Sequence, residues 1–240
     1  MRQSIRKFDF TPLTQEKKQE IEEYAKSIKP LLSEVSTQIV LLEQKDMKPS
    51  PLKVKAPYYL VFCSRRSNGY YENAGYLAEQ MALYLHKIGL GCCYSGMAKV
   101  GKQAAAELEF EPIAVIAFGE GKACIDRNVK DFKRKELSEI YSGTKYEEII
   151  EAARLAPSAV NSQPWYFSER GNIIDVYRVK NKGIKETMIG VKARIDVGIA
   201  ICHLCIAANH LGFVTTPIIL GNRRMIKNKV LTATVALLKI

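Results

Sequence analysis

The densest group of hydrogen-bonding side chains in this sequence lies between two prolines, Pro157 and Pro164. It contains two hydroxyls and two carboxamides, from Ser158, Asn161, Ser162 and Gln163. A turn needs only one or two such residues, so the run offers more polar groups than chain reversal requires. Groups of this kind, held stiff between prolines, can read the polar edges of a flat heteroaromatic ring. A loop that merely closes a turn is the simpler alternative.

A second polar stretch opens the chain, and we call residues 2–8 (RQSIRKF) the arm. If the arm is extended, Arg2, Ser4 and Arg6 point to the same side, because side chains alternate along an extended chain. Guanidinium groups bind phosphate through paired hydrogen bonds, and a serine hydroxyl can donate to the same oxygens. The arm is therefore a candidate phosphate-binding segment. The alternative is a mobile basic terminus.

The bulk composition permits a large core and excludes few classes of protein. The chain has 240 residues, 47% of them hydrophobic, and a formal net charge of +11. The positive charges are scattered, and no zinc-ligand or RNA-binding signature accompanies them, so a solvated basic surface is favoured over a nucleic-acid interface. The first ten residues lack the apolar stretch of a secretory signal, which predicts a cytoplasmic protein. The apolar run 197–214 contains two histidines and an asparagine, which favours a core helix over a membrane span.

The six cysteines and three histidines give little sign of metal or acid–base chemistry. Four cysteines lie in apolar runs, and without a secretory signal all are expected to be reduced. Cys202 and Cys205 form a single CxxC with no second ligand pair, so no metal site is predicted. The three histidines fall in helical patterns and are interpreted as packing or surface residues.

Helical and strand patterns alternate irregularly along the chain. The hydrophobic periodicity predicts helices over 16–29, 71–88, 144–156 and 195–210, and strands over 56–64, 112–118, 165–169, 173–179 and 232–240. A glycine-rich turn is expected over 89–97. Because several strands follow one another without a helix between them, the fold class is α+β and not a doubly wound sheet.

The chain also repeats itself. Residues 73–90 resemble 196–213 at an offset of 123, so that Gly75 corresponds to Gly198, and residues 22–30 resemble 149–157 at an offset of 127. A period this long indicates a duplication and not a solenoid. We therefore expect two related halves, 1–125 and 126–240, folded as one globular unit around a pseudo-two-fold axis.

Together these stretches resemble the nitroreductase family of flavin enzymes. The family's R-x-S-x-R pattern is found at residues 2–6, and its A-P-S-x-x-N-x-Q-P-W motif at residues 156–165. Its G-L-G-x-C-W-x-G turn resembles residues 89–96, with Tyr94 in place of tryptophan. Its later strand and basic cluster resemble residues 115–119 and 133–135. The resemblance implies a nitroreductase-like fold, with mixed, mainly antiparallel sheets flanked by helices.

The order of the motifs departs from the family. An ordinary nitroreductase carries the arginine pattern and the proline–serine–asparagine motif in the same half, and two subunits share their sites. Here the first half has the arm and the glycine-rich turn, and the second half has the polar loop. The resemblance then implies one complete flavin site per chain and one degenerate site.

The resemblance implies bound FMN, with the arm and the basic residues near the phosphate and the polar loop and glycine-rich turn near the ring. Gln163 is assigned mainly to holding the loop in shape. No catalytic side chain is expected, because hydride transfer is the chemistry of the flavin itself. The expected cofactor-binding residues are Arg2, Gln3, Ser4, Arg6, Cys93, Tyr94, Ser95, Gly96, Lys133, Arg134, Lys135, Pro157, Ser158, Ala159, Asn161 and Gln163.

The expected function is an FMN-dependent oxidoreductase that reduces small nitro- or quinone-type substrates with NAD(P)H. No G-x-G-x-x-G opens a helix, so the nicotinamide is expected to use the same site as the second substrate, with ping-pong kinetics. One alternative is a protein that stores or senses flavin without turnover. A basic nucleic-acid-binding module is a weaker alternative. We expect a monomeric pseudo-dimer or a weak homo-oligomer, with no membrane partner.

Overall fold

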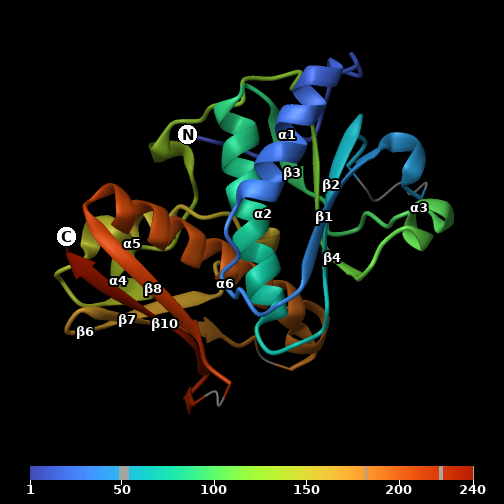
Figure 1. Cartoon of the computed structure of the whole chain (residues 1–240). Helices are drawn as coiled ribbons and strands as arrows, with labels where there is room; N and C mark the ends of the chain where they lie inside the picture. The colour runs from blue at the N-terminus through green and yellow to red at the C-terminus, as the bar shows by residue number, and fades with distance from the viewer. Residues whose placement is uncertain (49–53, 182, 222–223, 240) are drawn as a thin grey trace. The chain divides into compact units, whose positions relative to one another are not determined.

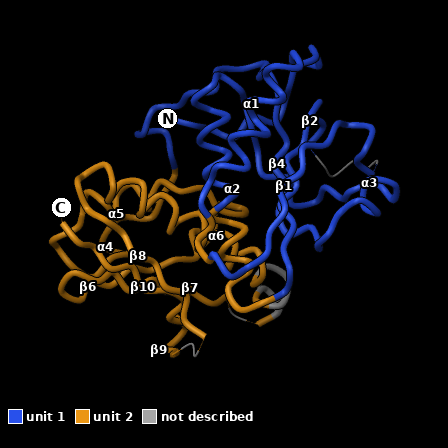
Figure 2. Tube along the Cα trace, viewed as in Figure 1, with its two compact units in different colours: residues 1–29, 33–66, 77–132 blue, residues 30–32, 67–76, 133–240 orange. Residues whose placement is uncertain are grey.

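The computed structural model describes residues 1–48, 54–181, 183–221 and 224–239, and the chain divides into two compact units (Figure 2). Unit 1 contains Met1–Lys29, Ser33–Arg66 and Leu77–Phe132. Unit 2 contains Pro30–Leu32, Ser67–Tyr76 and Lys133–Ile240. Figure 1 labels most of the helices and strands of the two units.

Unit 1 is built on an antiparallel four-stranded sheet with strand order β1-β2-β4-β3. The strands are β1 (Thr37–Glu43), β2 (Tyr58–Ser64), β3 (Gly91–Tyr94) and β4 (Glu111–Gly119). All seven residues of β2 are buried, because this central strand is covered on both faces. The unit also contains α1 (Gln15–Ser27), α3 (Lys102–Ala106) and two 3₁₀ turns, η1 (Gln44–Asp46) and η2 (Val129–Asp131).

The two faces of β2 belong to two different cores. Tyr58, Leu60 and Phe62 pack in a cluster with α1 and the helix α2 (Tyr70–Lys87), in which Ile21 is fully buried. The alternate residues of β2 pack in a second cluster that includes Ile5 of the arm. The alternation follows from the two-residue period of a strand.

Unit 2 is built on a six-stranded sheet in which β5 and β6 are parallel and the other pairs antiparallel. The order is β5-β6-β7-β10-β8, and β9 pairs with β10. The strands are β5 (Tyr141–Ser142), β6 (Trp165–Arg170), β7 (Ile173–Val179), β8 (Phe213–Ile219), β9 (Met225–Ile226) and β10 (Lys229–Lys239).

The helices of unit 2 are α4 (Leu137–Ile140), α5 (Glu147–Arg154), the 3₁₀ turn η3 (Ala159–Asn161) and the long α6 (Ile184–His210). Within the described part of α6, residues 197 and 199–202 are buried in succession, which marks it as a core helix. Over the described residues, no helix has the length and apolarity needed to cross a membrane.

Residues 70–76, the first turns of α2, belong to unit 2 and approach α6 at two glycines. A side chain on Gly75 would collide with the backbone oxygen of Ile195, and one on Gly198 would collide with that of Glu72. The two helices therefore meet backbone to backbone, which only glycine permits at these positions. Arg194 adds an ion pair with Glu72, with 2.9 Å between guanidinium and carboxylate.

The structure confirms the α+β class and changes several expected boundaries. The glycine-rich segment 89–97 is not a turn throughout, because residues 91–94 form β3 against β4. The helix expected over 195–210 begins eleven residues earlier, at Ile184. Strands β1 and β8 were not expected, and residue 240 of the expected last strand lies outside the described residues.

Candidate functional site

The arm is an ordered, extended segment of unit 1. It forms isolated β-bridges between Arg2 and Asp126, Ser4 and Cys92, and Phe8 and Gly121. Its buried side chains include Ile5, which is 4% exposed. A side chain on Gly91 would lie 2.9 Å from Ile5, so the arm can pack this closely against β3 only because that position is glycine. The interpretation as a mobile basic terminus is therefore wrong.

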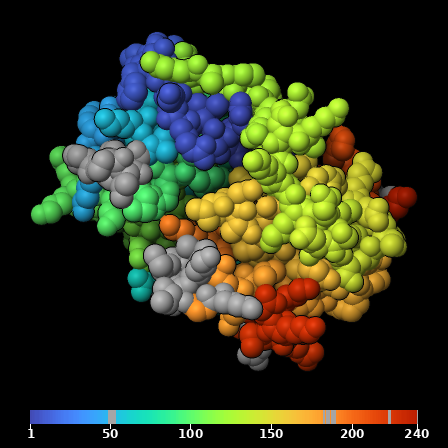
Figure 3. All heavy atoms as spheres, turned by 180° about the vertical axis from the view of Figure 1, so that it is seen from behind, coloured from blue at the N-terminus to red at the C-terminus, as the bar shows by residue number. Residues whose placement is uncertain are grey.

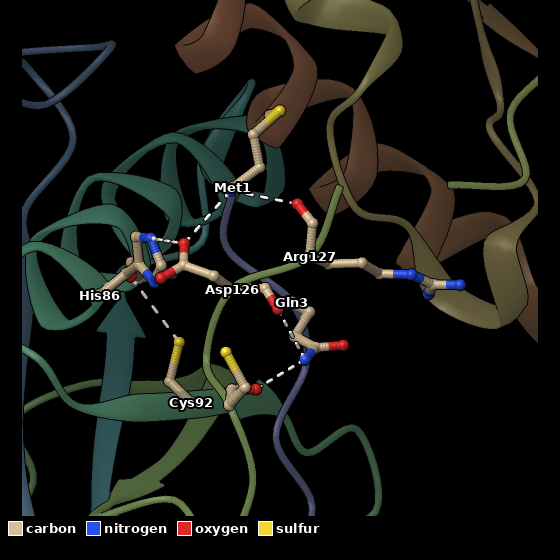
Figure 4. Close-up of polar contacts among 8 residues, drawn as sticks. Met1, Gln3, His86, Cys92, Asp126 and Arg127 are labelled. Carbon is tan, nitrogen blue, oxygen red and sulfur yellow. Dashed lines mark hydrogen bonds and ion pairs between the residues drawn. The ribbon is translucent and has the colours of Figure 1, made fainter. Parts of the chain in front are cut away.

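The first residues of the arm are anchored by the segment 124–127 (Figure 4). The amino group of Met1 donates to the carboxylate of Asp126 at 3.2 Å, and His86 lies 3.3 Å from the same carboxylate. The side-chain nitrogen of Gln3 donates to the backbone oxygens of Cys124 at 2.6 Å and Asp126 at 3.1 Å. The side-chain amide of Gln3 therefore binds the backbone of unit 1.

Arg2 points into unit 1 and joins a buried polar cluster on α2 and β3. Its side chain is 7% exposed, and its Nε lies 3.7 Å from the carboxylate of Glu79, whose side chain is fully buried. The hydroxyl of Tyr94 donates to the other oxygen of Glu79 at 2.8 Å. Burial alone would lower the pKa of Arg2, but the Glu79 carboxylate opposes this and the net shift is upward.

Ser4 and Arg6 follow Arg2 at alternate positions of the arm. All three act on one thiol, that of Cys93, which is 4% exposed. Burial raises the pKa of this thiol, while the charge of Arg6, a hydrogen bond with Ser4 and the charge of Arg2 lower it in part. Arg6 itself is exposed.

The segment after β3 holds a buried hydroxyl. Ser95 is 4% exposed, and its backbone N–H donates to Val115 at 2.8 Å. Within the described part of the chain, its Oγ is buried and has no hydrogen-bond partner. The neighbouring Gly96 is exposed. A buried hydroxyl left without a partner is uncommon and calls for an explanation, such as a group that the protein binds.

In unit 2 the polar loop (residues 158–163) is joined to the basic segment (residues 133–135). The carboxamide of Asn161 accepts from Arg134 at 2.9 Å and donates to the backbone oxygen of Lys133 at 2.8 Å. The carboxamide oxygen of Gln163 accepts from the backbone N–H of Lys135 at 2.7 Å. In Figure 3 the yellow-green atoms of the chain just after residue 130 lie against yellow atoms from around residue 160. These residues, distant in sequence, are therefore adjacent.

The basic segment has one side chain directed to solvent and two that hold the loop. Lys133 is exposed, whereas Arg134 also donates to the backbone oxygen of Leu155 at 3.0 Å. The ammonium group of Lys135 donates to the backbone oxygen of Gln163 at 3.0 Å. Burial lowers the pKa of Lys135. Lys133 is therefore the residue of this segment whose positive charge is best placed to bind a phosphate.

The backbone of the polar loop is strained. Val160, Asn161 and Gln163 all have positive φ, at 48°, 55° and 47°. A β-branched residue such as valine rarely adopts this region, and Val160 is also 86% exposed. Strain of this kind costs about 1–3 kcal/mol per residue and is concentrated at ligand clamps and active sites.

The remaining loop residues hold its ends. Pro157 follows α5, and the hydroxyl of Ser158 accepts from the backbone N–H of Gln163 at 2.9 Å. The backbone N–H of Ala159 donates to both carboxylate oxygens of Asp196 in α6, at 3.1 Å each. Gln163 is 5% exposed and also donates to the backbone oxygen of Asn161 at 3.2 Å. Gln163 therefore braces the loop from inside.

Among the described residues four carboxylates are buried that the sequence analysis did not single out, Glu72, Glu79, Asp175 and Asp196. Two of them, Glu79 and Asp196, contact residues of the predicted site. Both lie in long helices with mostly apolar surroundings, where a single sequence does not tell a buried acid from a surface one. Asp196 is 4% exposed, and burial raises its pKa to about 7, against the opposing effects of the Ala159 N–H and the charge of Lys192. The one available signal was the repeat, in which Asn73 corresponds to Asp196.

The structure thus brings the predicted residues together in two groups, each within one unit. The first contains the arm and residues 93–96, and the second contains residues 133–135 and 157–163. All six cysteines are free thiols, five of them buried and Cys124 exposed. Over the described residues no cluster of three potential metal ligands is found.

Comparison with known proteins gives one family and one fold. The family model described as "Putative TM nitroreductase" matches residues 1–208. A search of curated proteins finds no match. A crystal structure of a putative nitroreductase from Thermotoga maritima aligns with a TM-score of 0.64 and 19% identity, over 98% of this chain and 90% of the other. That likeness extends over both units and shows the fold.

Smaller relatives align over part of the chain. An FMN-dependent nitroreductase from Clostridium difficile has a TM-score of 0.45 and 15% identity, over 60% of this chain and 95% of its own. A putative NADH oxidase from Clostridium acetobutylicum has a TM-score of 0.43 and 17% identity, over 58% of this chain and 94% of its own.

Proposed function

Because its family model covers residues 1–208, the chain belongs to the putative TM nitroreductase family, and we propose that it is an FMN-dependent oxidoreductase. The family places it among the oxidoreductases. The finer proposal is that it reduces small electron-poor substrates, of the nitro or quinone type, with NAD(P)H as the electron donor.

The observation that carries the proposal is the strained polar loop clamped to the basic segment in unit 2. A loop that only reversed the chain would need neither three residues at positive φ nor an exposed valine at its tip. The clamp between Asn161 and Arg134 sets the exposed Lys133 beside this loop. A stiff, polar edge next to a cation suits a ligand with both a heteroaromatic ring and an anionic group.

The residues of unit 1 also fit FMN. The phosphate of FMN is doubly negative, and Arg6 is an exposed guanidinium two residues after Ser4, which, like Arg6, lowers the pKa of the Cys93 thiol. The buried Oγ of Ser95, which has no partner among the described residues, can donate to a ligand atom. Within unit 1 we assign a phosphate contact to Arg6 and ring contacts to residues 93–96. Within unit 2 we assign a phosphate contact to Lys133 and ring contacts to the polar loop.

Two residues of the expected set receive a different role in this proposal. Arg2 is buried against Glu79 of α2 and donates to the thiol of Cys92 in β3, so we assign it to holding the arm on these two elements and not to binding phosphate. The oxygen and the nitrogen of the Asn161 carboxamide both bind the basic segment. We therefore assign this side chain to keeping the loop in shape and only the backbone of Asn161 to contact with the ring.

When bound, FMN supplies the hydride transfer, so the protein needs no catalytic acid of its own. The chain's contribution is to hold the cofactor and to place positive charge near it. Positive charge near a flavin stabilises the reduced, negatively charged form and raises its reduction potential. Since the sequence has no dinucleotide-binding motif, we expect NAD(P)H and substrate to bind in turn, with parallel lines in initial-rate plots.

The first test is the visible spectrum of the purified protein after it has been incubated with FMN and freed of excess. One flavin per chain, reduced on addition of NADH or NADPH, is the expected result. Bound flavin that neither nicotinamide reduces would favour a storage or sensing protein. No bound flavin would overturn the proposal, and salt-dependent binding of DNA or RNA would then become the next experiment.

A further inference from the structure

The contact between α2 and α6 in unit 2 is reciprocal under the sequence repeat. At the offset of 123, Glu72 corresponds to Ile195 and Gly75 to Gly198. The structure pairs Gly75 with Ile195 and Gly198 with Glu72, so each helix presents the same two positions to the other. An exchange of this kind is what a two-fold axis produces. It supports the proposal that the chain arose by duplication.

A second pair of contacts follows the same repeat. The backbone N–H of Leu32 donates to the side-chain oxygen of Asn73 at 3.0 Å. The backbone N–H of Ala159 donates to the carboxylate of Asp196 at 3.1 Å. Leu32 and Ala159 each lie two residues after a proline that follows a helix, and Asn73 corresponds to Asp196. The same hydrogen bond therefore occurs twice in unit 2.

The two copies differ in charge and in the loop that they hold. Asn73 is neutral, and the segment after Leu32 reads SEVS, without the polar motif. Asp196 is a carboxyl group, and the segment after Ala159 is the strained polar loop. An ionised oxygen accepts a stronger hydrogen bond than an amide oxygen does. When it is ionised, Asp196 is therefore the stronger acceptor of the two, and it lies under the loop with the greater strain.

Asp196 binds the first residues of the polar loop, whereas the basic segment binds the last ones. Residues 133–135 bind the distal end, through Asn161 and Gln163. At the proximal end, Ala159 is fixed from α6 by Asp196, immediately before Val160 turns to positive φ. Because strained backbone persists only where its surroundings over-determine it, both ends need an anchor.

We propose that Asp196 is the positioning residue of the flavin-binding loop, fixing the Ala159 amide so that residues 158–163 keep their ligand-ready shape. Asn73 is the corresponding residue of the half whose loop no longer binds flavin. This inference rests on the proposed function for its ligand, but the effect on the loop itself does not depend on flavin. A carboxyl whose pKa is raised to about 7 by burial also makes the anchor's charge sensitive to pH near neutrality.

The test compares Asp196→Ala with Asp196→Asn, and uses Asn73→Ala as the matched control. Asp196→Ala removes the acceptor, so we expect the Kd for FMN to rise at least tenfold. Asp196→Asn keeps an oxygen for the Ala159 N–H, so we expect the Kd to stay within about threefold of the wild type. Asn73→Ala removes the same bond in the other half, so we expect no change in the Kd.

A second readout uses the protein without flavin. Hydrogen exchange of the Ala159 amide should quicken at least tenfold in Asp196→Ala and return close to the wild-type rate in Asp196→Asn. Equal exchange in all variants, or an equal loss of FMN affinity in Asn73→Ala, would overturn the inference. If the wild type binds no FMN, the proposed function fails, while the exchange rates still decide whether Asp196 positions the loop.

Discussion

Two buried carboxylates on long helices, Glu79 on α2 and Asp196 on α6, have very different surroundings. Glu79 is fully buried and has a guanidinium at 3.7 Å and a phenol at 2.8 Å. Asp196 is 4% exposed, and among the described residues its hydrogen bonds come from one backbone N–H, that of Ala159. Arg2 balances the charge of Glu79, whereas Asp196 has no ion-pair partner among the described residues. Pairing is not confined to unit 1, since the fully buried Glu72 of unit 2 is paired with Arg194 at 2.9 Å.

Glu79 and Asp196 thus show two ways in which this chain meets the cost of burying a carboxylate. A paired acid and base can both stay ionised, at the expense of fixing each other in place. An acid without a paired base is driven toward its neutral form instead, and this is why the pKa of Asp196 is raised to about 7. The Arg2–Glu79 pair is therefore suited to constant structure, and Asp196 to a state that varies with conditions.

The largest effect is expected when the cation of the Arg2–Glu79 pair is removed. We expect Arg2→Met to lower the free energy of unfolding by about 4 kcal/mol, since it deprives a buried carboxylate of its ion-pair partner. Urea denaturation measures the loss. Lys7→Met, at an exposed arm position, should change stability by no more than about 0.5 kcal/mol. The double variant Arg2→Met, Glu79→Gln should recover much of the loss; equal losses in single and double variants would contradict the pairing.

The second prediction uses the raised pKa of Asp196. The folded protein holds this proton more tightly than the unfolded chain, whose pKa is near 3.8, so stability falls as pH rises from about 4 to about 7. Between pH 5 and pH 8 this group should cost about 2–3 kcal/mol. Asp196→Asn should lack that part of the pH dependence. Parallel stability curves for variant and wild type over this range would count against a titrating Asp196.

The third prediction concerns the exposed side of the arm. Arg6→Ala should weaken FMN binding by more than about 1.5 kcal/mol, because charge-assisted hydrogen bonds are the strong kind. Its unfolding midpoint should hardly change, since Arg6 is exposed. Lys7→Ala is the control for general loss of positive charge, and fluorescence titration with FMN measures both. An unchanged affinity in Arg6→Ala would remove the arm from the phosphate site.

The smallest effect is expected at the loop's distal anchor. Asn161→Ala removes two hydrogen bonds to the basic segment, and we expect FMN affinity to fall by about 1 kcal/mol without unfolding. Asn172→Ala, an exposed amide in the same unit, is the control. Calorimetric titration and a melting curve separate affinity from stability. A variant that loses stability but not affinity would show that Asn161 serves the fold alone.

Much of the fold was readable from sequence where a period was clear. The helix expected over 71–88 differs from α2 by one residue at each end. The strand β8 was missed because its exposed residues alternate with partly buried ones, so its apolar pattern is weak. The early turns of α6 were missed because the segment 181–194 mixes charges with apolar residues.

The sequence predicted which residues belong to the candidate site, but it did not predict which of them would contact one another. The motifs placed the polar loop and basic segment in the expected set, but no pattern said that Asn161 and Arg134 would bind each other. Glu79 was missed because α2 is buried nearly all round, so helical periodicity leaves no solvent face on which to place a charge. A partner for Arg2 has to come from a residue more than seventy positions away, which a local pattern does not encode.

The backbone contact at Gly75 and Gly198 constrains how this protein can evolve. Where side chains pack, one substitution can be offset by a neighbour that shrinks or turns. Where a side chain would meet a carbonyl group, the only remedy is to move an entire helix. We therefore expect selection to keep both glycines together. A substitution at either position should be harmful even when a neighbouring residue changes with it. The crossing of α2 and α6 is therefore expected to tolerate little change in sequence at these two positions.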